Sequence, residues 1–296
     1  SIYCHFPSIP STELWKFALK VESEFTSLFP SPMKLAFEEK IYKRFLILTK
    51  KRYMAFTQNA DFSIDKNLTI RGVLLARRDN CKWIRNVYEQ TVRLLMDLSK
   101  SLPSRSEVED LIQEEVIKLC SHFYDVSHIT ITKSVGSEYK PKVVTGYDES
   151  TGKITDITKF KKRLEELEIS IKDQNWLQLY QEKMKPAHVQ LASKMASRGC
   201  PVSAGTRIEY LMIQHPNPKA KQFQKIEDPE YQKEYSDILK PDYFFVLKLA
   251  KNSLQQLISV VYNDSDMMDN IIQSHTQKAE VCGELLRLFQ PRIVFS

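Results

Sequence analysis

Residues 45–56 read FLILTKKRYMAF, an apolar run that is interrupted by three adjacent cations, Lys50, Lys51 and Arg52. Burying such charges without partners would cost several kcal/mol, so they either reach water or meet an anionic group. The β-branched and aromatic residues around them predict one continuous strand. Because side chains alternate along a strand, Lys51 and Tyr53 would point one way and Lys50 and Arg52 the other.

Positive charge is concentrated around this stretch. The formal net charge of the 296 residues is +6, and residues 1–80, with 13 basic and 8 acidic side chains, contribute +5 of it. Between Lys40 and Tyr53 there are six basic residues and no acidic one. A local basic patch of this kind suits a polyanion or an acidic membrane surface, although solvated basic faces are common.

Composition limits the class of protein. With 42% hydrophobic residues over this length, one or two domains with a substantial core are expected. The five cysteines lie far apart and form no C-x-x-C pair, which favours reduced intracellular thiols over a zinc module or a disulfide framework. No apolar run approaches the roughly 20 residues that a membrane-spanning helix needs.

The apolar pattern predicts an α+β fold, with a β-rich part up to about residue 78 and then a mostly helical part with short strands. Strands are predicted over residues 41–58, 68–76, 127–135 and 205–214. Helices are predicted over residues 12–28, 79–100, 158–183, 186–198, 242–262 and 266–290. One more helix is predicted to open with a capping box formed by Ser106 and Glu109. Residues 134–158, with three of the seven glycines, predict an exposed loop or insertion.

A second strand-like run also ends in cations. In RGVLLARRD, Arg77 and Arg78 follow the strand and precede a helix start at Asp79. Two strand ends of this kind indicate one continuous basic surface, on which Lys51 and Tyr53 would enter a minor groove while the other cations meet phosphates. From composition alone, solvated strand ends are the simpler interpretation, and Arg77 would then pair with Asp79 or another acid.

Five blocks of the sequence carry a resemblance to a known family. They are EKIYKRFLILTKKRYMAF (39–56), RGVLLARRDNCKWIRNVYEQTV (71–92), ITITK (129–133), PAHVQLASKMASRGCPVSAGTRIEYLMI (186–213) and KPDYFFVLKLAKNSLQQL (240–257). In this order and spacing they resemble B-family replicative DNA polymerases from the end of the palm through the thumb, those of large DNA viruses in particular. The resemblance implies a carboxyl-terminal part of the palm over residues 1–78 and a thumb over 79–296. Lys133 and His188 are 55 residues apart, further than the family usually has them, which implies an insertion within 134–185.

The resemblance also assigns roles to residues. Lys51 and Tyr53 match the K-x-Y positions that grip the primer terminus from the minor-groove side. Glu39 matches a palm glutamate near the metal site, although the family's EFE reads AFEE here. Thr132 and Lys133 in ITITK match positions that touch the duplex backbone.

Two further positions match the thumb of the family. Arg207 in AGTRI falls where thumbs touch the duplex backbone. His188 also matches a family position, and we expect it to pack or to cap a helix rather than to take part in chemistry.

The start of the chain resembles the end of a metal-binding motif. SIY is similar to the residues that directly follow the aspartates of that motif, so Ser1 would be the motif's own serine. The resemblance then implies two Mg²⁺ ions held mainly by aspartates outside this chain, and a fragment that is inactive alone.

The implied function is template-directed synthesis of viral DNA by the full-length chain. The implied partners are primer–template DNA, deoxynucleoside triphosphates and a processivity factor, with no membrane. The implied location is inside the host cell, in the cytoplasm or nucleus, at sites of viral replication.

Two other classes of function fit the basic strand ends. One is a duplex-binding module with no enzymatic role, which would need no acidic pair upstream. The other is a helical interaction domain whose basic patch binds a protein, which should ignore competing DNA.

Overall fold

The computed structural model describes residues 2–65, 67–73, 80–136, 139–140, 142–217 and 220–275. The fold is α+β, as the apolar pattern predicts. The chain forms two compact units, and both are assembled from segments that are separated in the sequence. Unit 1 consists of Ser1–Arg77, Arg85–Glu115 and Lys251–Ser296, and unit 2 of Arg78–Ile84 and Val116–Ala250. The palm and thumb boundary at residues 78 and 79 stays a prediction.

Unit 1 contains an antiparallel sheet in the order β1-β2-β3, made of β1 (Ile41–Thr49), β2 (Arg52–Gln58) and β3 (Thr69–Arg71). The prediction of one continuous strand over residues 41–58 is wrong, because the chain reverses at Lys50 and Lys51 and Thr49 pairs with Arg52. The reversal brings the charges into water while both apolar arms stay in the sheet. This hairpin explains why cations interrupt the apolar run.

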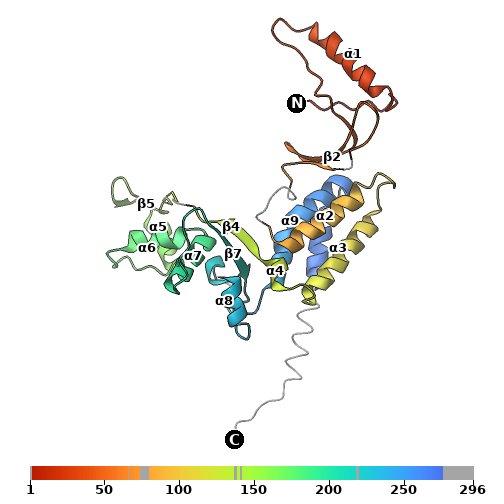
Figure 1. Ribbon diagram of the computed structural model, residues 1–296. Helices are drawn as coiled ribbons and strands as arrows, with labels where there is room; N and C mark the ends of the chain where they lie inside the picture. The colour runs from red at the N-terminus through yellow and green to blue at the C-terminus, as the bar shows by residue number, and fades with distance from the viewer. Residues whose placement is uncertain are drawn as a thin grey trace. The chain divides into compact units, whose positions relative to one another are not determined.

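Helices make up the rest of unit 1. They are α1 (Leu14–Thr26) and the segments within this unit of α2 (Lys82–Leu95), α3 (Arg105–Cys120) and α9 (Tyr243–Tyr262), followed by a helical stretch over residues 267–275. Figure 1 draws α2, α3 and α9 side by side as a bundle. A hydrogen bond and an ion pair join segments of the bundle. The Tyr262 hydroxyl donates to the Pro103 carbonyl at 2.8 Å, and Arg105 pairs with Asp264 at 2.6 Å.

The predicted capping box of α3 is displaced by two residues. Ser104, rather than Ser106, caps the helix, and Glu107 takes the place predicted for Glu109. The Ser104 amide donates to the Glu107 carboxylate at 2.7 Å, and the Glu107 amide donates to the Ser104 hydroxyl at 3.3 Å. Because α3 begins at Arg105, Ser104 is the residue that precedes its first turn and can accept from an amide of that turn. A capping box at Ser106 and Glu109 would lie inside the helix and leave the first amides unpaired.

The core of unit 2 is a second antiparallel sheet in the order β4-β7-β8. Its strands are β4 (Ile131–Ser134), β7 (Arg207–Met212) and β8 (Ile226–Glu227), and short helices α4 (Val126–Ile129), α7 (Ala187–Ser197) and α8 (Pro229–Glu234) accompany them. Gly199 follows α7 with φ +85°, the left-handed backbone that glycine commonly adopts just after the end of a helix. The strand predicted over 205–214 is confirmed by β7. The strand predicted over 127–135 is confirmed only in its second half, because residues 126–129 form α4, which Asp125 caps by accepting from the Ser127 amide.

Residues 142–184 of unit 2 have a small hydrophobic core of their own. The elements here are β5 (Tyr147–Asp148), β6 (Lys153–Ile154), α5 (Ile157–Glu166) and α6 (Trp176–Met184). The buried residues of this core are Val144, Phe160, Leu164, Leu167, Ile169 and Tyr180. We call residues 142–184 the small subdomain.

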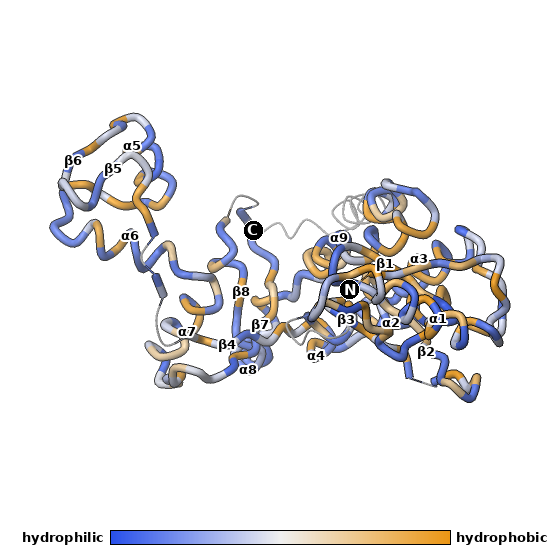
Figure 2. Tube along the Cα trace, turned by 90° about the horizontal axis from the view of Figure 1, so that it is seen from above, coloured by the Kyte–Doolittle hydropathy of each residue, from blue (hydrophilic) through white to orange (hydrophobic). Residues whose placement is uncertain are grey.

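The small subdomain corrects two predictions. The single helix expected over 158–183 is two helices, because Glu168 has a left-handed backbone (φ 53°) directly after the end of α5, and Ile169 then joins the buried core. The loop expected over 134–158 contains a β-hairpin. Hydrophobic and hydrophilic positions alternate along α5 and α6, as in helices that bury one side (Figure 2).

Candidate nucleic-acid interface

The three adjacent cations lie at the tip of the β1–β2 hairpin. Lys50 and Lys51 form its two-residue turn, and Arg52 opens β2 opposite Thr49. All three are exposed, so water solvates their charges and no buried counter-ion is needed. The tip therefore presents three positive charges that a polyanion can approach.

A glycine next to β3 allows close approach to this tip. Gly72 has φ +62°, and a Cβ atom built on it would lie 2.5 Å from the Lys51 carbonyl oxygen and 3.2 Å from Cγ of Arg52. Lys51 also has a left-handed backbone, with φ 65°. No side chain larger than hydrogen fits at residue 72 unless the turn moves. The position of Lys51 is therefore tied to that of β3.

Arg44 uses its charge for structure rather than for recognition. Its Nη2 donates to the Lys100 carbonyl at 3.0 Å, and its Nη1 donates to the carbonyls of Leu95 and Asp97. Leu95 is the last residue of α2, where carbonyl groups lack helical partners and a cation is favourable. One of the six basic residues between Lys40 and Tyr53 is thus committed to joining β1 to α2.

On the face of the β1-β2-β3 sheet that points away from Arg44, the side chains of Tyr42, Phe45 and Tyr53 lie together, and Tyr3 packs against them. We call these four residues the tyrosine cluster. The ring centroid of Tyr53 lies 5.6 Å from that of Tyr3 and 5.3 Å from that of Phe45. Tyr42 stacks on Phe45 at 4.9 Å. Edge-to-face and offset contacts of this kind are favourable, so the cluster restricts the Tyr53 ring.

Hydrogen bonds change the acidity of the tyrosine cluster. The pKa of Tyr53 is lowered, because hydrogen bonds from Tyr3, Tyr42 and Arg71 and the positive charge of Arg71 outweigh the effect of burial. The pKa of Tyr42 is raised by burial and by its hydrogen bond with Tyr53, and the pKa of Tyr3 is raised mainly by its own bond with Tyr53.

Glu39 lies just before β1, exposed and with φ 52°. The carboxylate whose charge acts on Tyr3 and Tyr42 belongs to the adjacent Glu38. Among the residues that the structure describes, no group of three or more His, Cys, Asp or Glu side chains could hold a metal ion. A divalent cation needs about six oxygen ligands, so Glu39 would serve only beside carboxylates from elsewhere. Its role near a metal site stays a prediction.

Unit 2 places the predicted backbone-contacting residues on two faces of β4 and β7. Thr132 lies directly opposite Glu209, and Ser134 lies opposite Arg207. Paired and next-but-one residues share a face, so Thr132 and Arg207 lie together on the exposed face. Lys133 pairs with Ile208 and lies on the other face of the sheet, the one that carries the buried residues. The structure thus brings Thr132 and Arg207 together and separates Lys133 from them.

His188 lies half-buried in α7, close to Lys133. Burial first, and then the positive charge of Lys133, lower its pKa, while a hydrogen bond with the Ser134 backbone opposes the shift. A neutral, packed imidazole with a backbone partner agrees with the packing role that we expect for it.

Two of the predicted site residues, Arg77 and Arg78, lie outside the described residues. Conversely, the structure identifies Arg71, which the sequence pattern did not single out. Arg71 lies directly opposite Tyr53 on β3, and its positive charge contributes to the lowered pKa of Tyr53. The only signal in the sequence near Arg71 is that it directly precedes Gly72, the glycine that packs against the tip of the β1–β2 hairpin.

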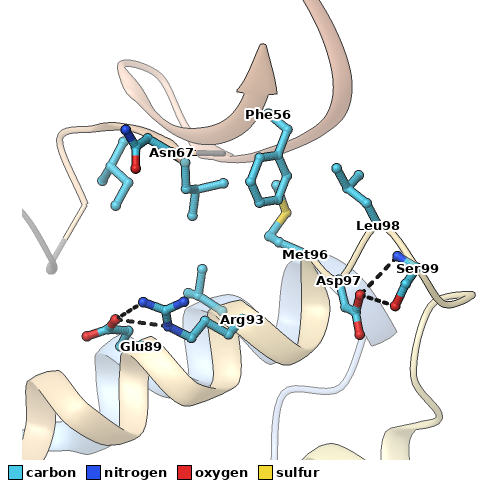
Figure 3. A pocket seen from close by; sticks show the side chains of 11 residues that line it. Phe56, Asn67, Glu89, Arg93, Met96, Asp97, Leu98 and Ser99 are labelled. Carbon is cyan, nitrogen blue, oxygen red and sulfur yellow. Dashed lines mark hydrogen bonds and ion pairs between the residues drawn. The ribbon is translucent and has the colours of Figure 1, made fainter. Parts of the chain in front are cut away.

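An open groove of about 550 Å³ lies between the sheet and α2 within unit 1 (Figure 3). Its walls are apolar side chains, Phe56, Leu68, Ile70, Val92, Met96 and Leu98. At its edges Glu89 pairs with Arg93 at 2.6 Å, and Asp97 accepts from the Ser99 hydroxyl at 2.6 Å. Because these polar groups already pair with one another, the groove offers no set of groups for catalysis.

Known proteins resemble this chain over most of its length. Residues 1–261 match the family model DNA polymerase family B. DNA polymerase 120R of Invertebrate iridescent virus 3 is 34% identical over 96% of this chain, and Putative DNA polymerase 060R of Frog virus 3 is 31% identical over 86%. The chain covers 25% and 26% of those two proteins, so it spans about a quarter of their length.

A solved structure supports the fold. The family B DNA polymerase from the hyperthermophilic archaeon Pyrobaculum calidifontis matches 85% of this chain with a TM-score of 0.50 and 19% sequence identity. The chain covers 25% of that polymerase. Within the described ranges, no helix is long and apolar enough to cross a membrane.

Proposed function

Because the chain belongs to DNA polymerase family B, we propose that it is the part of a DNA-directed DNA polymerase that grips the primer terminus and the new duplex during synthesis of viral DNA. The chemical groups of this chain are suited to binding a substrate rather than to the chemical step. Its described residues offer cations, hydroxyls and a rigid hairpin, which hold a substrate in place. The family match gives no support to a non-catalytic duplex-binding module.

One observation carries the proposal: the contact between Tyr53 and Tyr3. Their ring centroids are 5.6 Å apart, so the hairpin that bears Lys51 and Tyr53 lies beside the start of the chain. The motif resemblance places metal-holding aspartates directly before Ser1. A residue advances the chain by at most about 3.6 Å, so aspartates three and five residues before Tyr3 would lie within about 11 Å and about 18 Å of it. A primer end held at Tyr53 would therefore lie near those aspartates.

The residues of this chain would act by positioning. Lys51 and Tyr53 would hold the terminal base pair from the minor groove, and Thr132 and Arg207 would contact phosphates of the duplex behind it. Two Mg²⁺ ions, held by aspartates outside the chain with Glu39 as a neighbouring carboxylate, would supply activation of the primer 3′-oxygen and stabilisation of the leaving group. Misplacement of the reacting atoms by about 1 Å can cost a hundredfold in rate.

The partners follow from this role. We propose primer–template DNA and deoxynucleoside triphosphates as substrates of the full-length protein, no association with a membrane, a processivity factor as a further partner, and viral replication sites inside the host cell as the location. Lys133, Lys50 and Arg52 would add less specific attraction to the polyanion, as would Arg77 and Arg78.

The test uses the full-length protein and its Lys51→Ala variant, with Lys20→Ala on α1 as a charge-matched control. We expect the wild type to extend a primer and Lys51→Ala to bind primer–template DNA more weakly, with the salt dependence of log Kd reduced by roughly one ion. Lys20→Ala should change neither quantity. A wild type that extends no primer would overturn the proposed function, and an unchanged salt slope for Lys51→Ala would remove Lys51 from the DNA contact.

A further inference from the structure

Arg85, on α2, is a cation of unit 1 whose charge has no counter-ion. Its side chain is half-buried, and its Nε atom is buried without a hydrogen-bond partner. Within the ranges that the structure describes, no residue forms an ion pair or a hydrogen bond with this side chain. A donor that has lost its water and gained no acceptor is unfavourable, most of all when it is charged.

The acidic residue that could pair with Arg85 is already engaged. Arg85, Glu89 and Arg93 follow one another at four-residue intervals on the same stripe of α2. Arg93 takes the carboxylate, since its Nε and Nη2 both donate to Glu89 Oε1, at 2.9 and 2.6 Å. A helix also favours the pair in which the acid precedes the base, which is the pair of Glu89 with Arg93. Arg85 is therefore left with its charge uncompensated.

The place of Arg85 in α2 gives no local reason for a cation either. The helix begins at Lys82, and its first turn, which Arg85 closes, contains no acidic residue. Because the N-terminal end of a helix carries partial positive charge, a cation there is unfavourable. The described residues thus supply nothing that favours a guanidinium at this position, and an anion from outside them would.

Arg85 lies in the part of unit 1 that also carries the hairpin tip. Leu68 and Ile70, on either side of the start of β3, line one wall of the apolar groove, and α2 lines the other. One turn after Arg85, burial raises the pKa of Tyr88, and the positive charge of Arg52 opposes that rise. The tip is therefore close to the turn of α2 that bears Arg85.

We propose that Arg85 binds a backbone phosphate of the primer–template duplex, as an extension of the basic hairpin tip. The proposal rests on the proposed function and adds to it a residue that neither the sequence pattern nor the resemblance singled out. A guanidinium presents its donors in a planar fork that matches two phosphate oxygens. A polyanion would meet Arg85 together with Lys50 and Lys51 at the tip, whereas a single carboxylate would compensate one charge only.

Loss of this charge should affect DNA binding and stability in opposite directions. Arg85→Met keeps a long unbranched side chain and removes the unpaired donors. Without DNA, the full-length variant should melt at the wild-type temperature or above it. It should bind primer–template DNA roughly tenfold more weakly, with the salt dependence of log Kd reduced by about one ion.

Two further variants serve as controls. Arg93→Met makes the same substitution on the same helix, but at an arginine that is paired with Glu89, so its salt dependence should stay close to that of the wild type. Arg85→Lys keeps the charge and loses the planar fork. It should keep the wild-type salt dependence and lose part of the affinity.

A scan of the DNA backbone identifies the phosphate. Duplexes that carry a single neutral methylphosphonate at successive positions remove one backbone charge at a time. At one position the substitution should weaken binding by the wild type and by Arg93→Met, and have little further effect on Arg85→Met. If Arg85→Met does not fold, Arg85→Lys takes its place, and the same position should affect it less than the wild type.

The outcomes separate this proposal from the proposed function. If the wild type extends primers but the salt dependence of Arg85→Met is unchanged, or no position in the scan is coupled to residue 85, the phosphate contact is overturned alone. A lower melting temperature of Arg85→Met with unchanged DNA binding would overturn it in favour of an ion pair with a carboxylate elsewhere in the full-length protein. A wild type that extends no primer would overturn both.

Discussion

At the scale of single residues, neighbours of the same type have different tasks. Lys43 and Arg44 are adjacent cations on β1, yet Lys43 is exposed while Arg44 donates to three carbonyl groups at the end of α2. Lys51 and Arg52 are adjacent at the hairpin tip, and the charge of Arg52 acts on the buried Tyr88 of α2. The net charge of the stretch therefore overstates the charge available to a polyanion.

Gly72→Ala should destabilise the β1–β2 hairpin by about 1–3 kcal/mol, because a left-handed backbone disfavours alanine and its methyl group would meet the Lys51 carbonyl. Hydrogen exchange of the hairpin amides measures the effect. Gly152→Ala is the matched control, since Gly152 has φ +67° and no atom closer than 4.0 Å to an added Cβ. Equal losses of protection at the two sites would show that strain alone, and not contact with the tip, matters at residue 72.

At the scale of elements, single side chains join strands to helices over long sequence distances. Arg44→Ala should weaken the attachment of β1 to α2 by about 1–3 kcal/mol, because carbonyl groups at the helix end lose a charged donor. The melting temperature of the full-length protein and exchange of the amides in the last turn of α2 measure this loss. Lys43→Ala removes the same charge one residue away and should have little effect. If Lys43→Ala destabilises the protein as much, general charge and not the cap is responsible.

A second such junction joins α7 to β8. Glu227 is 1% exposed and accepts from Lys194 at 2.6 Å and from Arg198 at 2.8 Å. Burial alone would raise the pKa of Glu227, but the hydrogen bonds from Arg198, Lys194 and the Asp228 amide outweigh it and lower the pKa. Arg198 also lies 3.5 Å from the centre of the Tyr231 ring.

This junction should make unit 2 sensitive to acid. The folded pKa of Glu227 lies below the unfolded value near 4.5, so its stabilisation is present above pH 4.5 and is lost as the pH falls through the folded pKa. Glu227→Gln should remove that dependence and cost about 1–3 kcal/mol at neutral pH. Thermal melting between pH 3 and 7 measures both, with Glu209→Gln on the exposed face of β7 as control. An unchanged acid profile for Glu227→Gln would contradict the assignment.

At the scale of the whole molecule, the small subdomain has a hydrophobic core of its own. Its buried residues all lie within 144–180, and its two ends are hydrogen-bonded, since Lys142 N donates to Gln181 Oε1 at 2.7 Å and Gln181 Nε2 to the Lys142 carbonyl at 2.9 Å. Closely spaced ends are what allow an insertion to be tolerated in a folded chain. Among the described residues, the hydrogen bond of Lys221 to the Glu166 carbonyl joins the small subdomain to the chain beyond residue 190.

We therefore expect that replacing residues 143–180 by a short Gly-Ser linker leaves the remaining protein folded. The full-length variant should extend primers at a rate within severalfold of wild type and keep its melting temperature within a few degrees. A matched variant with Phe160→Ala should unfold the subdomain alone. Loss of primer extension in the replaced, folded variant would show instead that these residues contribute to the reaction.

Much of the local structure could be predicted from the sequence. Apolar periodicity correctly indicated α1, α7, α9 and β7 and the second half of the strand at 127–135, because it reflects how each segment meets a core and needs only neighbouring residues. The hairpin was missed because its turn, Lys50 and Lys51, lacks the Asn, Asp or Gly residues that usually mark one. The capping box was misplaced because serine and glutamate recur at the same spacing within a few residues.

The sequence by itself determined that the three cations had to reach water, which strand and helix types occur, and which family the chain belongs to, because desolvation, periodicity and motif order are properties of the chain itself. Only the tertiary structure decided that Arg44 caps α2, that Arg71 faces Tyr53, and that Thr132 shares a face with Arg207 but not with Lys133. These pairings join residues up to 75 positions apart and depend on strand register or on the packing of elements. They are fixed by the packing of whole elements, which no short stretch of sequence specifies.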